Sequence, residues 1–116
     1  MEGEGYEAGL AAFRRGDMAR AAALWSRDPV RAHPDEYTLQ VLIACEPATL
    51  AKIHDRAEAA TSLFLTPLQV RGRSCYRVCW GVHPNREAAE AARSTLPAYL
   101  RGGEKPLPVV LGRLVP

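Results

Sequence analysis

The sequence has little of what marks membrane proteins, secreted precursors and disulfide-rich domains. No apolar run approaches the roughly 20 residues that a membrane-spanning helix requires. The residues from Met1 to Glu4 are acidic and polar, the reverse of the basic start of a secretory leader. Cysteine occurs three times, an odd number, so we expect no complete disulfide framework. We therefore expect neither a membrane span nor a targeting segment within this chain.

Motifs of catalysis and metal binding are also missing. No glycine-rich phosphate loop, nucleophile elbow or zinc-protease helix occurs. His33, His54 and His83 are scattered without metal-ligand spacing. Cys75 and Cys79 lie on one expected strand, about 13 Å apart at about 3.3 Å per residue, so they cannot share a zinc ion and are expected to be free thiols. The expectation is a non-catalytic binding module with no metal and no cofactor.

Composition and charge fit one small globular domain with a short appendage. Hydrophobic residues make up 47% and charged residues 24% of the 116-residue chain, which are ordinary globular values. The formal net charge of +2 is too small to indicate a nucleic-acid or membrane partner. Arg71, Arg73 and Arg77 lie close together in the basic second part of the chain. Such a cluster can contact phosphate or carboxylate, or can be a solvated hairpin.

Residues 1–28 are predicted to form a helical hairpin. Gly16 suits a left-handed helix end, and Asp17 can cap the next helix. The spacing of small and aromatic residues over 6–28 resembles one tetratricopeptide unit, which cannot bury its own faces. We expect the hairpin either to end an array or to dock on the rest of the chain, and residues 29–36 to form a linker. The resemblance is carried by Gly9, Phe13, Gly16, Asp17, Ala21 and Trp25.

The rest of the chain, residues 37–116, alternates between strand and helix patterns. Its order, β-α-β-β-α-β, is that of a split βαβ unit. We therefore predict an α+β, ferredoxin/RNP-like fold, with two helices on one face of a four-stranded antiparallel sheet and the other face open. Strands are expected at 37–44, 62–71, 74–81 and 107–114, and helices at 47–60 and 85–100, the second of them ended or kinked at Pro97.

Strict alternation along the strands assigns side chains to the two faces of this sheet. It leaves Gln40, Leu42 and Arg77 on the open face. Trp80 is expected on the covered face, provided that no β-bulge interrupts the strand at 74–81. The residues expected beneath the helices are Leu39, Val41, Ile43, Tyr76, Val78 and Trp80.

Residues 37–115 resemble the SPOR (sporulation-related repeat) family. The likeness lies in YTLQV, which includes Gln40, and in GRSCYRV from Gly72, then Gly81 and NREAAEAARSTL. It implies binding of peptidoglycan glycan strands through the open sheet face, without metal or cofactor. It also implies a periplasmic or cell-envelope location, where the domain would target a larger parent protein to the cell wall or division site. The ligand-binding positions expected on this basis are Gln40, Leu42, Arg73, Cys75 and Arg77.

Two departures from the family pattern keep alternatives open. Family members often carry an aromatic residue where this chain has Cys75, and a small polar residue where it has Ile43. The second hypothesis is therefore a protein-interaction module that keeps the fold without glycan binding and contacts a partner through the helical hairpin. An RNA-recognition module is disfavoured because Tyr76 and Trp80 are expected on the covered face, so we expect no nucleic-acid partner.

Overall fold

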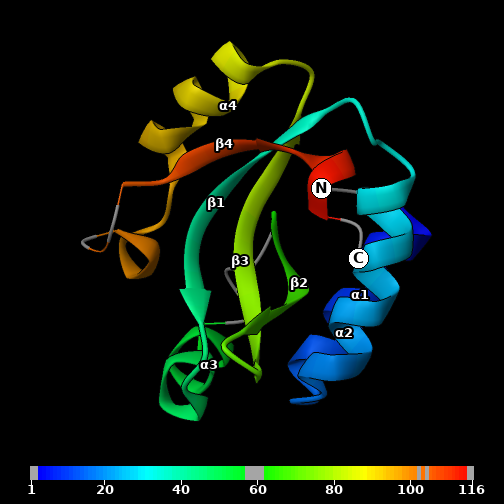
Figure 1. Cartoon of the computed structure of the whole chain (residues 1–116), viewed down its shortest axis with the longest axis vertical. Helices are drawn as coiled ribbons and strands as arrows, with labels where there is room; N and C mark the ends of the chain where they lie inside the picture. Colours follow the sequence, from blue (N-terminus) through cyan, green and yellow to red (C-terminus); the bar gives the residue numbers. More distant parts are fainter. Residues whose placement is uncertain (1–2, 57–61, 102, 104, 115–116) are drawn as a thin grey trace.

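The computed structural model describes residues 3–56, 62–101, 103 and 105–114. These residues form an α+β structure with a four-stranded antiparallel sheet and four α-helices (Figure 1). The elements are α1 (Glu4–Arg14), α2 (Met18–Trp25), β1 (Tyr37–Ala44), α3 (Pro47–His54), β2 (Leu63–Val70), β3 (Arg73–His83), α4 (Arg86–Ala91) and β4 (Leu107–Val110).

Helices α1 and α2 form the predicted hairpin, and its turn has the expected chemistry. Gly16 has a φ of 82°, a left-handed conformation that glycine adopts without steric cost. The Asp17 side chain accepts a hydrogen bond from the Arg20 backbone N–H at 3.1 Å and so caps α2. Both local predictions are confirmed.

The hairpin is docked on the sheet. The Tyr6 hydroxyl donates a hydrogen bond of 2.8 Å to the Leu63 carbonyl of β2. The Trp25 indole donates one of 3.1 Å to the Tyr6 carbonyl, and the Tyr6 and Trp25 rings stack with centroids 5.8 Å apart. Figure 1 shows α1 and α2 along the β2 side of the sheet, away from α4. Hairpin and sheet share one apolar core.

The segment predicted as a linker also makes ordered contacts. Val30 is buried in the core. The Leu111 N–H donates to the Glu36 carbonyl at 2.8 Å, and the Gly112 N–H donates to the Pro34 carbonyl at 2.9 Å. Residues 29–36 are therefore attached to the short turn Leu111–Leu114 (η5), which takes the place of the expected second half of the last strand.

The two sheet-packing helices begin as predicted and end early. Pro47 stands in the first turn of α3, and the Asn85 side chain caps α4 by accepting from the Ala88 N–H at 2.8 Å. Helix α4 passes at Ala92 into a tighter turn, and Leu96 is extended because the residue before a proline avoids the helical region. The helix predicted over 85–100 is thus too long. Residues 57–60 of the other predicted helix lie outside the described residues.

The sheet order is β2-β3-β1-β4. β2 and β3 are joined by the two-residue loop Arg71-Gly72, in which both residues have positive φ (51° and 80°), as a tight hairpin turn requires. The hairpin predicted around Gly72 is confirmed.

β1 contains a β-bulge that strict alternation did not anticipate. Between Gln40 and Leu42, β1 advances two residues while β3 advances one, so Val41 is the extra residue. The alternation of β1 therefore reverses beyond Val41. The pairs on either side are Leu39 with Trp80, Gln40 with Cys79, Leu42 with Val78, and Ile43 with Arg77.

This bulge overturns two face assignments. Ile43, expected beneath the helices, shares a face with Arg77 and is 45% exposed. Leu42, expected on the open face, shares a face with Val78 and packs against the core.

The prediction of a fully open second face is wrong at the β2 side of the sheet. Four successive residues of β2, from Leu63 to Thr66, have 0% exposure, and successive strand residues point to opposite faces. Both faces are therefore covered at β2. Cys79 of β3, on the face of Gln40, is fully buried as well. The accessible part of this face is confined to the β1–β4 side.

Candidate functional site

A hollow of about 260 Å³ lies at the β1–β4 side of the sheet. Its rim holds Ile43 and Leu107, which are 45% and 53% exposed and are the exposed large apolar side chains among the described residues. We call it the β1–β4 hollow. It is lined by Gln40, Val41, Leu42, Ile43, Lys105 and Leu107.

The hollow exists because β4 is short and β1 is bulged. β4 pairs with β1 only from Tyr37 to Gln40, and Leu107 stands opposite Gln40 at the end of this ladder. β1 continues to Ala44 without β4 beside it, and the bulge at Val41 turns Ile43 outward. Two apolar side chains thus flank the Gln40 amide where the ladder stops.

Gln40 and Arg77 lie on the same face, as alternation predicts. Gln40 pairs with Cys79, and Arg77 lies two residues from Cys79 on β3. Both side chains are half-buried, and neither hydrogen-bonds to a described residue. Their amide and guanidinium groups are therefore available to a ligand. Ligand contact by either residue stays a prediction.

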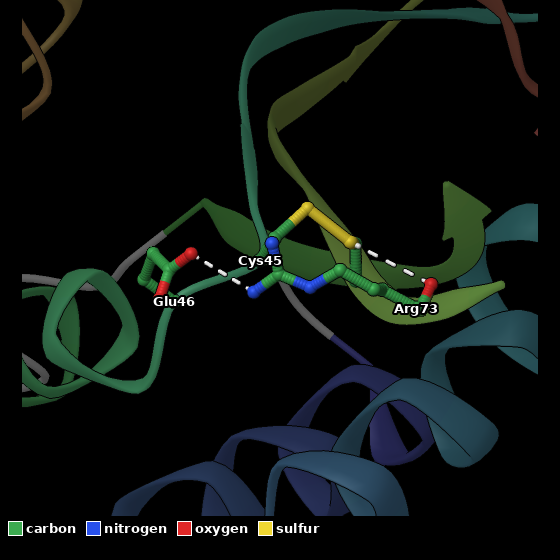
Figure 2. Close-up of polar contacts among 4 residues, drawn as sticks. Cys45, Glu46 and Arg73 are labelled. Carbon is green, nitrogen blue, oxygen red and sulfur yellow. Dashed lines mark hydrogen bonds and ion pairs between the residues drawn. A yellow bond between two sulfur atoms is a disulfide. The ribbon is translucent and has the colours of Figure 1, made fainter. Parts of the chain in front are cut away.

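Arg73 is placed elsewhere and is already engaged. Its Nη2 atom lies 2.9 Å from Oε1 of Glu46, at the start of α3 (Figure 2). Both side chains are exposed, and Arg73 does not line the β1–β4 hollow. A ligand reaching Arg73 would compete with a carboxylate that already occupies the guanidinium.

Cys75 forms a disulfide with Cys45 (Figure 2), which corrects the expectation of a free thiol. The register that pairs Ala44 with Tyr76 brings Cys45 opposite Cys75, with Cα atoms 4.3 Å apart. Cys75 is 1% exposed, so its side chain presents no accessible surface to a ligand. Cys79 is the free cysteine, and burial raises its pKa to about 12.

Two of the five predicted positions, Gln40 and Leu42, meet in the hollow, and Arg77 shares the face of Gln40. Sequence reasoning missed Ile43, Lys105 and Leu107. The prolines around Leu107 were the available signal, because proline is typical of short edge strands. Nothing in the sequence marked the bulge that exposes Ile43.

Within the described ranges, no group of three or more histidine, cysteine or acidic side chains could hold a metal ion. None of the described helices is both long and apolar enough to cross a membrane.

Comparison with known proteins gave no match. No family model matches the chain, and neither the curated proteins nor the solved structures yield a significant similarity. The resemblance to SPOR domains therefore rests on short sequence motifs alone, and a functional assignment has to be argued from the geometry of this molecule.

Proposed function

We propose that this chain is a non-catalytic module that binds peptidoglycan glycan strands at the β1–β4 hollow and targets a larger parent protein to the cell wall or division site. One observation carries the proposal. Ile43 and Leu107, the two exposed large apolar side chains among the described residues, flank in a single hollow the Gln40 amide, which hydrogen-bonds to none of those residues.

The chemistry of the hollow suits a sugar chain. A sugar ring offers C–H surface on its faces and hydroxyl groups around its edge. Ile43 and Leu107 can cover the C–H surface and remove it from water. The Gln40 amide can both donate and accept hydrogen bonds, and the Lys105 ammonium donates. Arg77, next to Ile43 across the strands, extends the polar surface for the adjoining sugar of the strand.

The fold proposed for this function is the ferredoxin-like split βαβ arrangement of SPOR domains. The element order β1-α3-β2-β3-α4-β4 and the sheet order β2-β3-β1-β4 support it. In this arrangement both crossover connections are right-handed, and α3 and α4 share one face of the sheet. The β1–β4 hollow would then open on the face opposite to them.

The proposed location is the periplasm or cell envelope. The disulfide between Cys45 and Cys75 supports it, because structural disulfides persist in oxidising compartments.

Retention on purified sacculi, before and after amidase removal of stem peptides, tests the proposal. Wild-type protein should be retained, and more strongly after amidase treatment. Gln40→Ala and Ile43→Ser should both lose retention, because each removes one kind of contact with the sugar. Gln69→Ala is the matched control, since Gln69 is an exposed strand glutamine of β2 outside the hollow. Absence of retention at every protein concentration would refute the proposal.

The second candidate is a protein-interaction module, favoured by the strand edge beside the hollow. β1 has no β4 partner from Val41 to Ala44, next to the apolar Ile43 and Leu107. An extended peptide could add to this edge through backbone hydrogen bonds and place side chains on the apolar rim. Two results together would identify this function. The protein should bind extended apolar peptides in an array, with binding abolished by Ile43→Asp, and sacculi should not retain it.

A further inference from the structure

The Cys45–Cys75 disulfide and the bulge in β1 are linked through the number of residues in the two strands. From the pair of Gln40 with Cys79 to the crosslink, β1 advances five residues and β3 advances four. The difference is the one extra residue of the bulge. The crosslinked pair and the bulged register therefore require each other.

Without the bulge the two cysteines would not face each other. In a regular continuation from Gln40, Cys45 would stand opposite Ser74, and Ala44 opposite Cys75. Successive strand residues point to opposite faces of the sheet, so Cys45 would then point away from Cys75. Cysteines whose Cβ atoms point apart cannot be joined without backbone movement. The disulfide therefore selects the bulged register over the regular one.

The regular register would bury an equally apolar set of side chains. It turns Val41 and Ile43 toward the core and Leu42 outward, which is the arrangement that strict alternation predicts. Leucine and isoleucine have nearly the same volume, so their exchange leaves the core filled. Val41 would also pair with Val78 of β3, whereas it is now the unpaired extra residue of the bulge.

Among the described residues, the pairing that opposes this shift is weak. β4 pairs with β1 only as far as Gln40, so residues 41–44 lie in a single ladder with β3. The shift would also separate Arg73 from Glu46. Both of these side chains are exposed, and exposed ion pairs contribute little to stability.

The β1–β4 hollow depends on the bulge. It is lined by four successive residues of β1, from Gln40 to Ile43. A regular strand turns successive side chains to opposite faces, so it could not present all four to one hollow. Loss of the bulge would therefore rebuild the wall against which a ligand packs.

We propose that the Cys45–Cys75 disulfide is a redox-controlled lock on the β1–β4 hollow. In the oxidised chain the bulge holds Ile43 in the hollow. In the reduced chain β1 takes the regular register, Ile43 turns toward the core and Leu42 turns outward. The effect on ligand binding rests on the glycan binding proposed above, whereas the change of register does not.

The reductant is a dithiol. One of its thiolates attacks Sγ of Cys45, which is half-buried, whereas Cys75 is 1% exposed. Cys75 leaves as a thiolate and takes up a proton, and Cys45 is held in a mixed disulfide with the reductant. The second thiol of the reductant then displaces Cys45. Two electrons pass to the two cysteines, and the dithiol becomes a disulfide.

The test compares the oxidised full chain with the chain reduced by dithiothreitol. The methyl groups of leucine and isoleucine are ¹³C-labelled, and a soluble paramagnetic agent broadens the signals of exposed methyl groups. In the oxidised chain the Ile43 signals should broaden more than those of Leu42. Reduction should reverse this order and abolish retention on sacculi.

Deletion of Val41 is the matched control. It removes the extra residue and keeps Cys45 opposite Cys75, so the crosslink no longer competes with a regular strand. Ile43 should therefore remain more exposed than Leu42 in both redox states of this variant.

A second variant tests the lock without reduction, by moving the crosslink one residue along β1. Ala44→Cys/Cys45→Ala places the cysteine at the position that faces Cys75 only in the regular register. The oxidised variant should contain one free thiol, as wild type does, and should expose Leu42 in place of Ile43. Sacculi should not retain it.

Three outcomes would overturn the proposal: Ile43 still more exposed than Leu42 after reduction, unfolding of the reduced chain in the absence of urea, or three free thiols in the oxidised Ala44→Cys/Cys45→Ala variant. A failure of glycan binding looks different. Oxidised wild type would then not be retained on sacculi, while the methyl signals would still exchange on reduction.

Discussion

Removal of the Cys45–Cys75 disulfide should destabilise the protein strongly. The bond joins the end of β1 to β3 across a sequence separation of 30 residues and encloses α3 and β2. In the chain-entropy description, a crosslink that closes a loop of this length stabilises the folded state by about 3.5 kcal/mol. The crosslink acts mainly by restricting the unfolded chain.

The assay is equilibrium unfolding in urea, with and without a phosphine reductant, monitored by tryptophan fluorescence. Trp25 and Trp80 are both buried, so their emission should report loss of the core. With a urea dependence of about 1.5 kcal/mol per M, the midpoint should fall by roughly 2 M on reduction. The double variant Cys45→Ala/Cys75→Ala should show the low midpoint in either buffer.

The control variant is Cys79→Ala, which removes the buried free thiol. Its urea midpoint should fall on reduction by as much as that of wild type, because the Cys45–Cys75 crosslink remains. Thiol titration of the denatured chain should find one free thiol before reduction and three afterwards. An unchanged midpoint, in samples whose thiol count has risen from one to three, would show that the crosslink does not carry this stability.

Two further predictions concern the core. Gly9→Ala should lower the free energy of unfolding in urea by about 2 kcal/mol, because the added Cβ would collide with the Trp25 indole that packs against Gly9. The control is Ala8→Gly on the exposed side of α1, which should lower it by no more than about 1 kcal/mol. The free energy of unfolding should also fall in alkali, because burial raises the pKa of the Cys79 thiol from 9.0 to about 12. The stability that the protonated thiol contributes is complete below pH 9, and between pH 9 and 12 it is lost at about 1.4 kcal/mol per pH unit. Cys79→Ala should reduce the loss of unfolding free energy between pH 9 and 12 by about 1.4 kcal/mol per pH unit. The same pH dependence in Cys79→Ala and wild type would contradict the assigned burial of the thiol.

The features that the sequence predicted correctly are encoded by residues close together in the chain. Gly16 and Asp17 place the hairpin turn, Arg71-Gly72 joins β2 to β3, and Asn85 begins α4. Each of these depends on a backbone conformation or a hydrogen bond within about four residues. The length of a helix is set less locally, which is why the run expected over 85–100 stops at Ala91.

The disulfide could not be predicted from cysteine positions alone. Three cysteines allow three single pairings, and spacing gave no reason to choose Cys45. The choice is made by the register of β1 on β3, which brings Cys45 opposite Cys75 and leaves Cys79 four residues further along in the core. That register depends on the bulge at Val41, a feature of two paired strands that neither strand specifies by itself.

The same bulge decides what the candidate site is made of. Gln40 precedes it, so alternation placed Gln40 correctly on the accessible face, whereas Leu42 and Ile43 come after it and exchange places. With a regular strand, Leu42 would point outward and Ile43 would be buried beneath the helices. Since Leu107 stands opposite Gln40, its exposed side chain would remain, but Ile43 would no longer face the same hollow. The pairing of two apolar side chains around one amide, which is the basis of the proposed glycan site, is therefore a property of the β1–β3 register and not of any motif in the chain.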